Sequence, residues 1–434
     1  MLFKNITILD KEFEPVRNQY VLTDKDRFVY IGSDDPVEKG IVSNGHEVID
    51  GTDKLIMPAF YNTHCHISMT LLRGIGEGLS LNDWLNTKVF PFEAVFEEEE
   101  KYWGAMLGAE ELISSGCVSV SDFYSCLVRY AKGLYAAGMK ANICNGMVIF
   151  DQEKSFFSDR SYTDTVEMMN YARSLSDGRM ISDISVHDEF TTTDKTVEEC
   201  VGFAKENGLR MQIHMSEAKI NHDSCVKRRG MTPAQYFEGK GLFDIPTTAA
   251  HCVQVTDEDI EILKKHHVFV SHCISSNLKL GSGIAPVKKF YDRGVTVTIG
   301  TDGASSNNNL NCFEEMHLAA MVCRGVNHDS NAIPAKEILR IATRNGALAQ
   351  GREDCGLIDT GMKADFIVLD LDKPHLYPDF DIVSNIVFSA QSSDVWMTVC
   401  DGDILYKNGE FTHLDTEEIK AKARESLEKV LKRM

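Results

Sequence analysis

Two histidines that flank a single cysteine, His64 and His66 in the segment THCH, directly follow an apolar run of the chain. Residues two apart on a β-strand point to the same side of a sheet, so both imidazoles could face one ion. Neutral imidazole is a common ligand of divalent transition metals, although two neighbouring histidines can also have only structural roles. The pair alone therefore indicates a shared site, and a metal centre would need further ligands.

Further candidate ligands stand at the ends of later apolar segments. His214 ends LRMQIHM, His251 ends TTAAHC and Asp302 ends VTVTIGTD. One more histidine and one aspartate, added to the first pair, would suit a divalent transition metal that keeps an open position for water. Glu217 follows His214 by three residues, so its carboxyl group lies just beyond the strand end, where it could transfer protons.

Eight short segments rich in β-branched residues alternate with helical patterns. The first precedes His64, and the others span residues 117–123, 141–148, 181–187, 209–215, 247–253, 267–273 and 295–302. Eight alternations within about 300 residues predict an α/β fold with a closed parallel (β/α)8, TIM-like barrel; a doubly wound open sheet is the alternative. In a barrel, the strand ends on one rim carry the chemistry.

Both ends of the chain differ in pattern from this central part. Short hairpin-like strands occur before Met57 and after about Asp359, and neither end alone could bury both faces of a sheet. We expect residues 1–56 and 359–434 to meet as one small β-sandwich domain beside a catalytic barrel of residues 57–358. Residues 416–434 are predicted to form an amphipathic helix with a solvated basic face.

Composition limits the partners of the chain. Its 434 residues are 43% hydrophobic and 25% charged, as in globular enzymes, and a formal charge of -20 would repel nucleic acid and anionic membranes. The start lacks a signal-peptide pattern, no run of 18 apolar residues occurs, and the twelve cysteines contain no CxxC pair. We expect a cytoplasmic protein with reduced thiols and a small-molecule substrate, without nucleic acid or membrane partners.

A set of motifs resembles one known family. They occur in order over almost the whole chain: MPAFYNTHCHISMTLLRG, LSLNDWLNTKVFPFE, QIHMSEA, AAHCVQ, VSHCISSNLKLGSGIAP, GTDGASSNNNLN and GLIDTGMKADFIVLD. They are similar to motifs of the amidohydrolase superfamily, and within it to the aminohydrolases and chlorohydrolases that include methylthioadenosine and adenosylhomocysteine deaminases. The resemblance implies a metal-dependent hydrolase that releases ammonia from an adenosine-type nucleoside, and a homodimer is usual among similar proteins.

The resemblance also assigns roles to single residues. It implies four metal ligands, namely His64, His66, His214 and Asp302, and three catalytic residues, namely Glu217, His251 and Asp302. The segment ISDISVH contains no lysine that could be carbamylated to bridge two ions, so one ion is favoured. Zn²⁺ is expected, with Fe²⁺ or Mn²⁺ as alternatives, because a histidine and carboxylate shell accepts all three.

The implied reaction is a hydrolytic deamination. The ion would lower the pKa of its bound water toward neutrality, and Asp302 would take the remaining proton. Glu217 would protonate the ring nitrogen beside the attacked carbon, while His251 polarises the attacking oxygen. His251 has an alternative role as a hydrogen-bond partner behind a ligand.

Four more residues are implied in substrate binding, namely Trp84, Glu93, His187 and Ser306. An indole offers a large apolar face, and a carboxylate can accept hydrogen bonds from both hydroxyls of a ribose. The alternative is that Trp84 is a core aromatic residue and Glu93 an exposed acid of an amphipathic segment.

Two departures from the deaminase pattern bear on the substrate. Asn145 stands where adenosylhomocysteine deaminases carry an arginine for the amino-acid carboxylate, and Arg160 is the nearest candidate to replace it. Asp188 and Glu189 follow His187 where those deaminases have a proline and an aromatic residue. We therefore expect 5'-methylthioadenosine or adenosine, with a small or neutral 5' group, in preference to S-adenosylhomocysteine.

Other functions are compatible with the same residues. A similar site could deaminate guanine or a pterin, or displace chloride from a triazine, and release of ammonia or chloride would separate these reactions. The chain could also be a non-catalytic scaffold or a nucleoside-binding module, which turnover of bound ligand would exclude.

Overall fold

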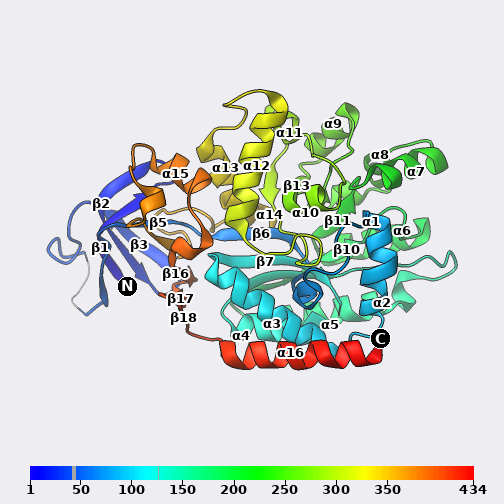
Figure 1. Ribbon diagram of the computed structural model, residues 1–434, viewed down its shortest axis with the longest axis horizontal. Helices are drawn as coiled ribbons and strands as arrows, with labels where there is room; N and C mark the ends of the chain where they lie inside the picture. The colour runs from blue at the N-terminus through cyan, green and yellow to red at the C-terminus, as the bar shows by residue number, and fades with distance from the viewer. Residues whose placement is uncertain (42–44, 126) are drawn as a thin grey trace.

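The computed structural model describes residues 1–41, 45–125 and 127–434, and its centre consists of two parallel sheets with helices around them (Figure 1). The first sheet contains β6 (Phe60–Cys65), β7 (Cys117–Tyr124), β8 (Lys140–Asn145) and β9 (Met180–Ser182). The second contains β10 (Ile184–Val186), β11 (Met211–Met215), β12 (Thr247–His251), β13 (Phe269–His272) and β14 (Val297–Ile299). All eight predicted strand segments are present, and the fourth is divided into β9 and β10.

The two sheets adjoin at two places. β10 contacts β8, and beside them the N–H of Asp183 donates to the carbonyl of Ile143 over 3.0 Å. β14 contacts β6, where the hydroxyl oxygens of Thr63 and Thr298 lie 2.6 Å apart. The prediction of a parallel α/β fold is confirmed, and the carboxyl ends of the strands from both sheets lie close to one another.

Helices connect successive strands. Those up to β14 are α3 (Glu98–Ser114), α4 (Leu127–Ala136), α5 (Arg160–Ser174), α6 (Asp194–Asn207), α7 (Lys219–Arg229), α8 (Pro233–Gly239), α9 (Asp257–Lys265), α10 (Ile274–Lys279) and α11 (Val287–Arg293). Those after β14 are α12 (Cys312–Asn327), α13 (Ala335–Ala342), α14 (Arg344–Ala349), α15 (Ile382–Phe388) and α16 (Thr416–Arg433). Every residue of β6, β7 and β8 is buried, as expected for parallel strands covered on both faces.

The two ends of the chain pair in a third, nine-stranded sheet (Figure 1). Its order is β18 (Glu410–Phe411), β17 (Asp403–Lys407), β16 (Val395–Cys400), β15 (Phe366–Asp370), β5 (Lys54–Pro58), β1 (Leu2–Leu9), β2 (Pro15–Asp24) and β3 (Arg27–Gly32), with β4 (Val48–Asp50) beside β1. β5 joins the ends because it pairs with β1 on one side and with β15 on the other. The first half of β2 is polar and largely exposed.

A buried ionic cluster links this terminal sheet to the parallel strands. Lys140, at the start of β8, bonds to Asp365 and lies 2.8 Å from Asp401, and both aspartates belong to the terminal sheet or its loops. The hydroxyl of Tyr61 on β6 donates to Asp365 as well. The side chain of Lys140 is 3% exposed and that of Asp365 is fully buried. The terminal sheet and the first parallel sheet therefore meet through paired charges.

The C-terminal helix is present as predicted and packs along α3 (Figure 1). Its basic face is not wholly solvated, because Arg433 pairs with the buried carboxylate of Glu100. The described cysteines are all free and buried, in agreement with the expected reduced thiols. Within the described ranges, the helices lack the combination of length and apolarity that crossing a membrane requires.

Candidate active site

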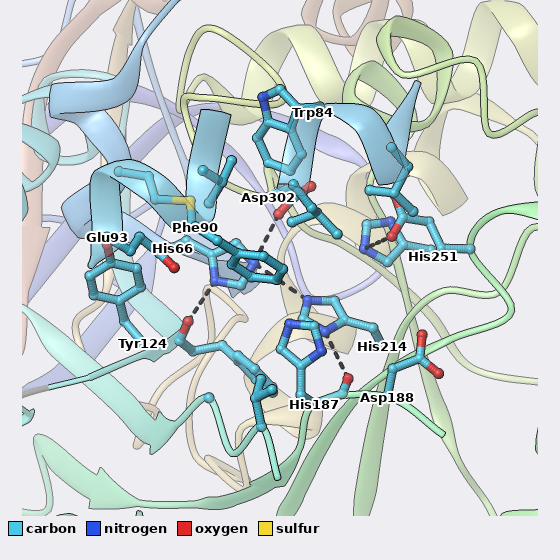
Figure 2. A pocket seen from close by; sticks show the side chains of 18 of the residues that line it. His66, Trp84, Phe90, Glu93, Tyr124, His187, Asp188, His214, His251 and Asp302 are labelled. Atoms are coloured by element: carbon cyan, nitrogen blue, oxygen red, sulfur yellow. Dashed lines mark hydrogen bonds and ion pairs between the residues drawn. The ribbon is translucent and has the colours of Figure 1, made fainter. Parts of the chain in front are cut away.

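Three histidines and one aspartate converge at the carboxyl ends of the parallel strands. Figure 2 shows His66, His214 and Asp302 of this group. His64 lies on β6 with His66 just after it, His214 lies on β11, and Asp302 follows β14. Nε2 of His66 is 3.2 Å from Oδ1 of Asp302 and 3.4 Å from Nε2 of His214. Nε2 of His64 is 3.6 Å from the same aspartate oxygen. The structure thus brings together the four residues predicted as ligands.

Hydrogen bonds at Nδ1 fix the orientation of these imidazoles. Nδ1 of His66 lies 2.5 Å from the carbonyl oxygen of Phe123, and Nδ1 of His214 lies 2.9 Å from that of His187. A carbonyl oxygen only accepts, so each Nδ1 donates its proton and each Nε2 points to the centre, where it could bind an ion through its lone pair. Burial would lower the pKa of His66, but Asp302 beside it raises that pKa to about 9. Metal-binding histidines are held in this way.

Asp302 is held as a carboxylate. The hydroxyls of Ser276 and Ser306 donate to Oδ2 over 2.6 and 2.7 Å, and the N–H of Gly303 donates to Oδ1 over 2.8 Å. Burial alone would raise the pKa of Asp302, but the imidazoles of His64 and His66 beside it outweigh burial and hold the pKa well below its ordinary value.

The backbone at these strand ends takes an uncommon conformation. φ is +59° at Asp302, +71° at His251 and +49° at Ser216. Ser216 lies between His214 and Glu217 in the sequence. Positive φ at a non-glycine residue costs on the order of 1–3 kcal/mol and is concentrated at functional sites. The local backbone is therefore arranged to aim these side chains.

The donor set fits a divalent ion. Within each of two groups, His64 with His66 and His214, and His64 with His251 and Asp302, the ligand atoms lie within 4.8 Å of one another. Nε2 of His64 is buried and has no hydrogen-bond partner among the described residues, and burial lowers the pKa of this histidine to about 4. A buried polar atom without a partner costs free energy that a bound cation would recover.

Glu217 and His251, the latter labelled in Figure 2, line the pocket that contains His66, His214 and Asp302. Nε2 of His251 is 3.7 Å from Oε2 of Glu217, and Nδ1 of His251 is 2.9 Å from Oδ1 of Asn277, to which it donates. The hydroxyl of Ser282 lies 3.4 Å from Oε1 of Glu217. Burial raises the pKa of Glu217, which favours the protonated form that a general acid requires.

Trp84 and Glu93 both line the pocket although they lie nine residues apart. They belong to one helical segment made of α1 (Leu81–Trp84), a π-helical turn (Leu85–Val89) and α2 (Phe90–Glu93). Nine residues are about two and a half α-helical turns, which would place the side chains on opposite faces. The wider π-helical turn changes this register, so both residues can face the pocket.

His187 also lines the pocket. Ser306 is not among the described residues that line it. Nδ1 of His187 lies 3.1 Å from Oγ1 of Thr191, and burial lowers the pKa of His187 to about 3, so its ring is neutral at pH 7. Ser306 is 1% exposed and lies behind Asp302, to which its hydroxyl donates. The structure therefore places Ser306 as a support of the aspartate.

Asn145 and Arg160, which the sequence connected with the 5' end of the substrate, lie outside the described pocket lining. The side-chain amide of Asn145 donates to Asp164 over 2.7 Å. The side chain of Arg160 is 72% exposed, and its Nε lies 3.4 Å from the same carboxylate. Among the described residues that line the pocket there is no lysine or arginine, whereas four are carboxylates, namely Glu93, Asp188, Glu217 and Asp302.

Sequence reasoning missed part of the site. Ser276 and Asn277 hold Asp302 and His251, and their position just after a predicted strand end was a signal that could have identified them. The apolar wall residues had no such signal, since a pocket-lining phenylalanine or leucine looks like a core residue in sequence; these are Phe90, Phe123, Phe190 and Leu280.

Comparison with known families identifies the class of protein. The profile of the amidohydrolase family matches residues 55–405, which include all the parallel strands and every candidate ligand. The chain belongs to the amidohydrolase family.

Individual relatives are similar over nearly their whole length. A protein of Thermoanaerobacter pseudethanolicus named 5-methylthioadenosine/S-adenosylhomocysteine deaminase is 36% identical over 422 residues, 96% of each chain. A protein of Methanocaldococcus jannaschii named 5'-deoxyadenosine deaminase is 37% identical over 430 residues, 99% of each chain. The crystal structure of an adenosine deaminase from Xanthomonas campestris with bound zinc superposes with a TM-score of 0.93 at 26% identity, covering 99% of this chain and 98% of the other.

Proposed function

We propose that this protein is a metal-dependent aminohydrolase that releases ammonia from an adenosine-type nucleoside. The observation that carries the proposal is the convergence of His64, His66, His214 and Asp302 on one point of a pocket that also contains Glu217. The names of the deaminase relatives support the adenosine class of substrate.

We also propose that the parallel strands close into a (β/α)8 barrel of residues 57–358, beside a small β-sandwich domain of residues 1–56 and 359–434. The contacts of β10 with β8 and of β14 with β6 support closure. In such a barrel the site would lie on the carboxyl-terminal rim, where loops can vary without disturbing the core.

One divalent ion would be held by His64, His66, His214 and Asp302, and zinc is favoured because a solved relative contains it. When bound, the ion would supply a Lewis acid that activates water for attack at neutral pH. Two of the histidines donate their outer N–H to backbone carbonyls, which would leave Nε2 of each to bind the ion.

The protein groups would transfer the protons. Asp302 accepts a proton from the attacking water, because its carboxylate is ionised and fixed by two serine hydroxyls. Glu217 donates a proton to the ring nitrogen next to the attacked carbon, because burial keeps its pKa raised. His251, fixed at Nδ1 by Asn277, orients the attacking oxygen through Nε2.

The walls of the pocket indicate how a nucleoside would lie. The indole of Trp84 would pack against the ligand, and the carboxylate of Glu93 would accept hydrogen bonds from ribose hydroxyls. No lysine or arginine among the described lining residues could pair with a carboxylate at the 5' end. We therefore place 5'-methylthioadenosine and adenosine ahead of S-adenosylhomocysteine as substrates.

The test is ammonia release by the zinc-loaded protein from adenosine, 5'-methylthioadenosine, S-adenosylhomocysteine and guanine. We expect turnover of at least one adenosine derivative and a loss of about 10²–10⁴-fold in a Glu217→Gln variant. Glu258→Gln, which alters an exposed carboxylate on α9, is the matched control and should keep full activity. Activity on guanine alone would overturn the substrate class, and inactivity on every compound would overturn the reaction.

A further inference from the structure

The helical segment that carries Trp84 and Glu93 has little structure of its own to hold it in place. It consists of α1 and α2, of four residues each, and the π-helical turn between them, and none of the four described residues of α2 is buried. In the loop before it, Gly74 and Gly78 have φ of +80° and +77°, a conformation that glycine adopts readily. Because such short helices are marginal without tertiary contacts, the position of Glu93 depends on what holds the far end of the segment.

Helix α16 supplies a contact at that end. Nη1 of Arg433 donates to the carbonyl oxygen of Val95, two residues after Glu93, over 2.5 Å. The N–H of Phe96 donates to the carbonyl oxygen of Glu93 over 3.2 Å, so Val95 lies within the turn of backbone that begins at Glu93. In Figure 1 the C-terminal end of α16 lies just below α2. Arg433 therefore holds the same turn that carries the Glu93 side chain.

The guanidinium of Arg433 is itself fixed by a buried carboxylate of α3. Nη2 of Arg433 donates to Oε1 of Glu100, which is 1% exposed. Oε2 of Glu100 accepts a hydrogen bond from the N–H of Glu97 over 2.8 Å, so the carboxylate cannot turn freely. Hydrogen bonds between a guanidinium and a carboxylate are strong and directional. Glu100 thus fixes the guanidinium in the orientation in which Nη1 reaches Val95.

Apolar packing places the last turns of α16 behind the pocket wall. Val430, three residues before Arg433, is fully buried in a cluster that also contains Trp84, Tyr124 and Phe96. Trp84 and Tyr124 line the pocket, whereas Val430 and Phe96 are not among the described lining residues. The end of α16 therefore supports the wall from the side that faces away from the pocket.

We propose that Arg433 is a positioning residue that acts through Glu93 and sets the preference of the site for nucleosides with free ribose hydroxyls. This inference rests on the proposed function, in which the Glu93 carboxylate accepts hydrogen bonds from the ribose. Arg433 is not among the described residues that line the pocket, so it would not touch the substrate. Binding groups must be held closely in their productive geometry, and a loosened turn at Val95 would let the Glu93 carboxylate move away from the hydroxyls.

The test compares adenosine with 2',3'-dideoxyadenosine, which lacks both hydroxyls, as substrates of the zinc-loaded protein. We call the ratio of kcat/KM for adenosine to kcat/KM for 2',3'-dideoxyadenosine the hydroxyl preference. In Arg433→Met we expect the hydroxyl preference to fall at least about tenfold, as for the loss of one hydrogen bond to a charged group. Glu93→Gln, which alters the binding carboxylate itself, should lower it at least as far.

A second variant separates this effect from a loss of stability. Arg433→Met leaves Glu100 buried without its cation, which destabilises the fold. Adding Glu100→Gln removes the unpaired charge, so the double variant should unfold at a higher urea concentration than Arg433→Met alone. The hydroxyl preference of the double variant should nevertheless stay as low, because Val95 still lacks its donor.

Lys420→Met is the matched control. Lys420 lies 3.8 Å from Glu110 and forms another ion pair between α16 and α3, so its loss should leave the hydroxyl preference unchanged. An equal fall in this control would overturn the assignment to Arg433, since loosening α16 anywhere would then suffice. A hydroxyl preference that stays at the parent value in Arg433→Met and in the double variant would overturn the proposal, as would an unchanged preference in Glu93→Gln.

Failure of the proposed function gives a different result, because the parent protein would then release ammonia from neither nucleoside. In that case the dissociation constants of adenosine and 2',3'-dideoxyadenosine, measured by calorimetry, decide the question. Tighter binding of adenosine that is lost in Arg433→Met and kept in Lys420→Met would support the role of Arg433. Equal affinities in all these proteins, or no binding of either nucleoside, would overturn it.

Discussion

The two ends of the same parallel strands bury charges in opposite ways. Near Tyr61, at the beginning of β6, the ammonium group of Lys140 meets the carboxylates of Asp365 and Asp401, so positive and negative groups are paired. Near His64, at the other end of β6, imidazoles surround a carboxylate, and the described pocket contains no lysine or arginine. The first cluster pairs its charges within the protein, and the donor atoms of the second fit a bound ion.

The ionisation of the two clusters shows the same contrast. Burial alone would lower the pKa of Lys140, but the carboxylates beside it raise that pKa instead, so the lysine stays charged. Burial lowers the pKa of His64 to about 4 and that of His187 to about 3, whereas at His66 Asp302 outweighs burial and raises the pKa to about 9. Changes at the paired cluster should therefore cost stability, and changes at the histidine cluster should cost function.

The largest expected effect is on activity, in an Asp302→Asn variant. The substitution removes the carboxylate among the four proposed ligands, so we expect ammonia release to fall on the order of 10³-fold or more and bound zinc to be lost. Zinc content by atomic emission and the initial rate of ammonia release measure this. The melting temperature of the metal-free variant should stay within a few degrees of the parent protein.

Two results for the Asp302→Asn variant would contradict the assignment of the histidine cluster to function. A variant that keeps both zinc and activity would remove Asp302 from the site. A metal-free variant that unfolds as readily as one altered at the paired cluster would show that the aspartate serves stability.

The next effect is on stability, in a Lys140→Met variant. Methionine leaves Asp365 buried without its cation, whereas Asp401 keeps Arg179 and Lys363, so the substitution should cost about 3–5 kcal/mol of unfolding free energy. The midpoint of urea unfolding measures it, and kcat and KM of the folded fraction should remain within about threefold of the parent protein. Lys289→Met breaks an ion pair whose lysine is 57% exposed and should cost no more than about 1 kcal/mol.

A Lys140→Met variant as stable as the Lys289→Met control would contradict the assignment of the paired cluster to stability. A Lys140→Met variant that is stable but inactive would instead connect this end of the strands to catalysis.

The histidine cluster was predictable from sequence and the paired cluster was not. His64, His214 and Asp302 stand at the ends of recognisable strands, and parallel strands gather their carboxyl ends at one edge. Lys140 and Asp365 are 225 residues apart, and no local pattern connects a lysine at a strand start with an aspartate of the terminal sheet. Long-range pairing of this kind depends on how the two sheets pack.

The pocket walls were predictable only in part. Trp84 and Glu93 were inferred from resemblance, but the π-helical turn between them has no periodic signal in the sequence. Asp188 and Glu189 looked equivalent as two acids in one loop. Asp188 lines the pocket, whereas Glu189 pairs with two arginines of α7, about 40 residues further along the chain.

The smallest expected effect concerns Glu315, a buried carboxylate of α12. It is intermediate between the ion-paired Asp365 and the carboxylate of the histidine cluster, because hydrogen bonds alone hold it. Among the described residues it has hydrogen-bond donors but no paired cation: Asn307 donates to it over 2.8 Å and the N–H of Ser275 over 3.2 Å. Burial raises its pKa to about 8, against the opposing effect of these hydrogen bonds. The same Asn307 amide donates to the carbonyl of Thr301, next to Asp302, so Glu315 supports the loop that carries the aspartate.

Because the pKa of Glu315 is higher in the folded state than in the unfolded chain, the folded state retains a proton that the unfolded state loses between about pH 4.5 and 8. This group therefore lowers the unfolding free energy as pH rises through that window, by at most about 1.4 kcal/mol per pH unit, and has no further effect above it. In Glu315→Gln, urea midpoints of the metal-free protein from about pH 5.8 to 8.5 should fall less steeply than in the parent. Equal pH dependence of the urea midpoints in Glu315→Gln and the parent protein would mean that Glu315 is ionised throughout this range. The protein would then hold a buried carboxylate in its charged form near the histidine cluster, and the prediction would be wrong.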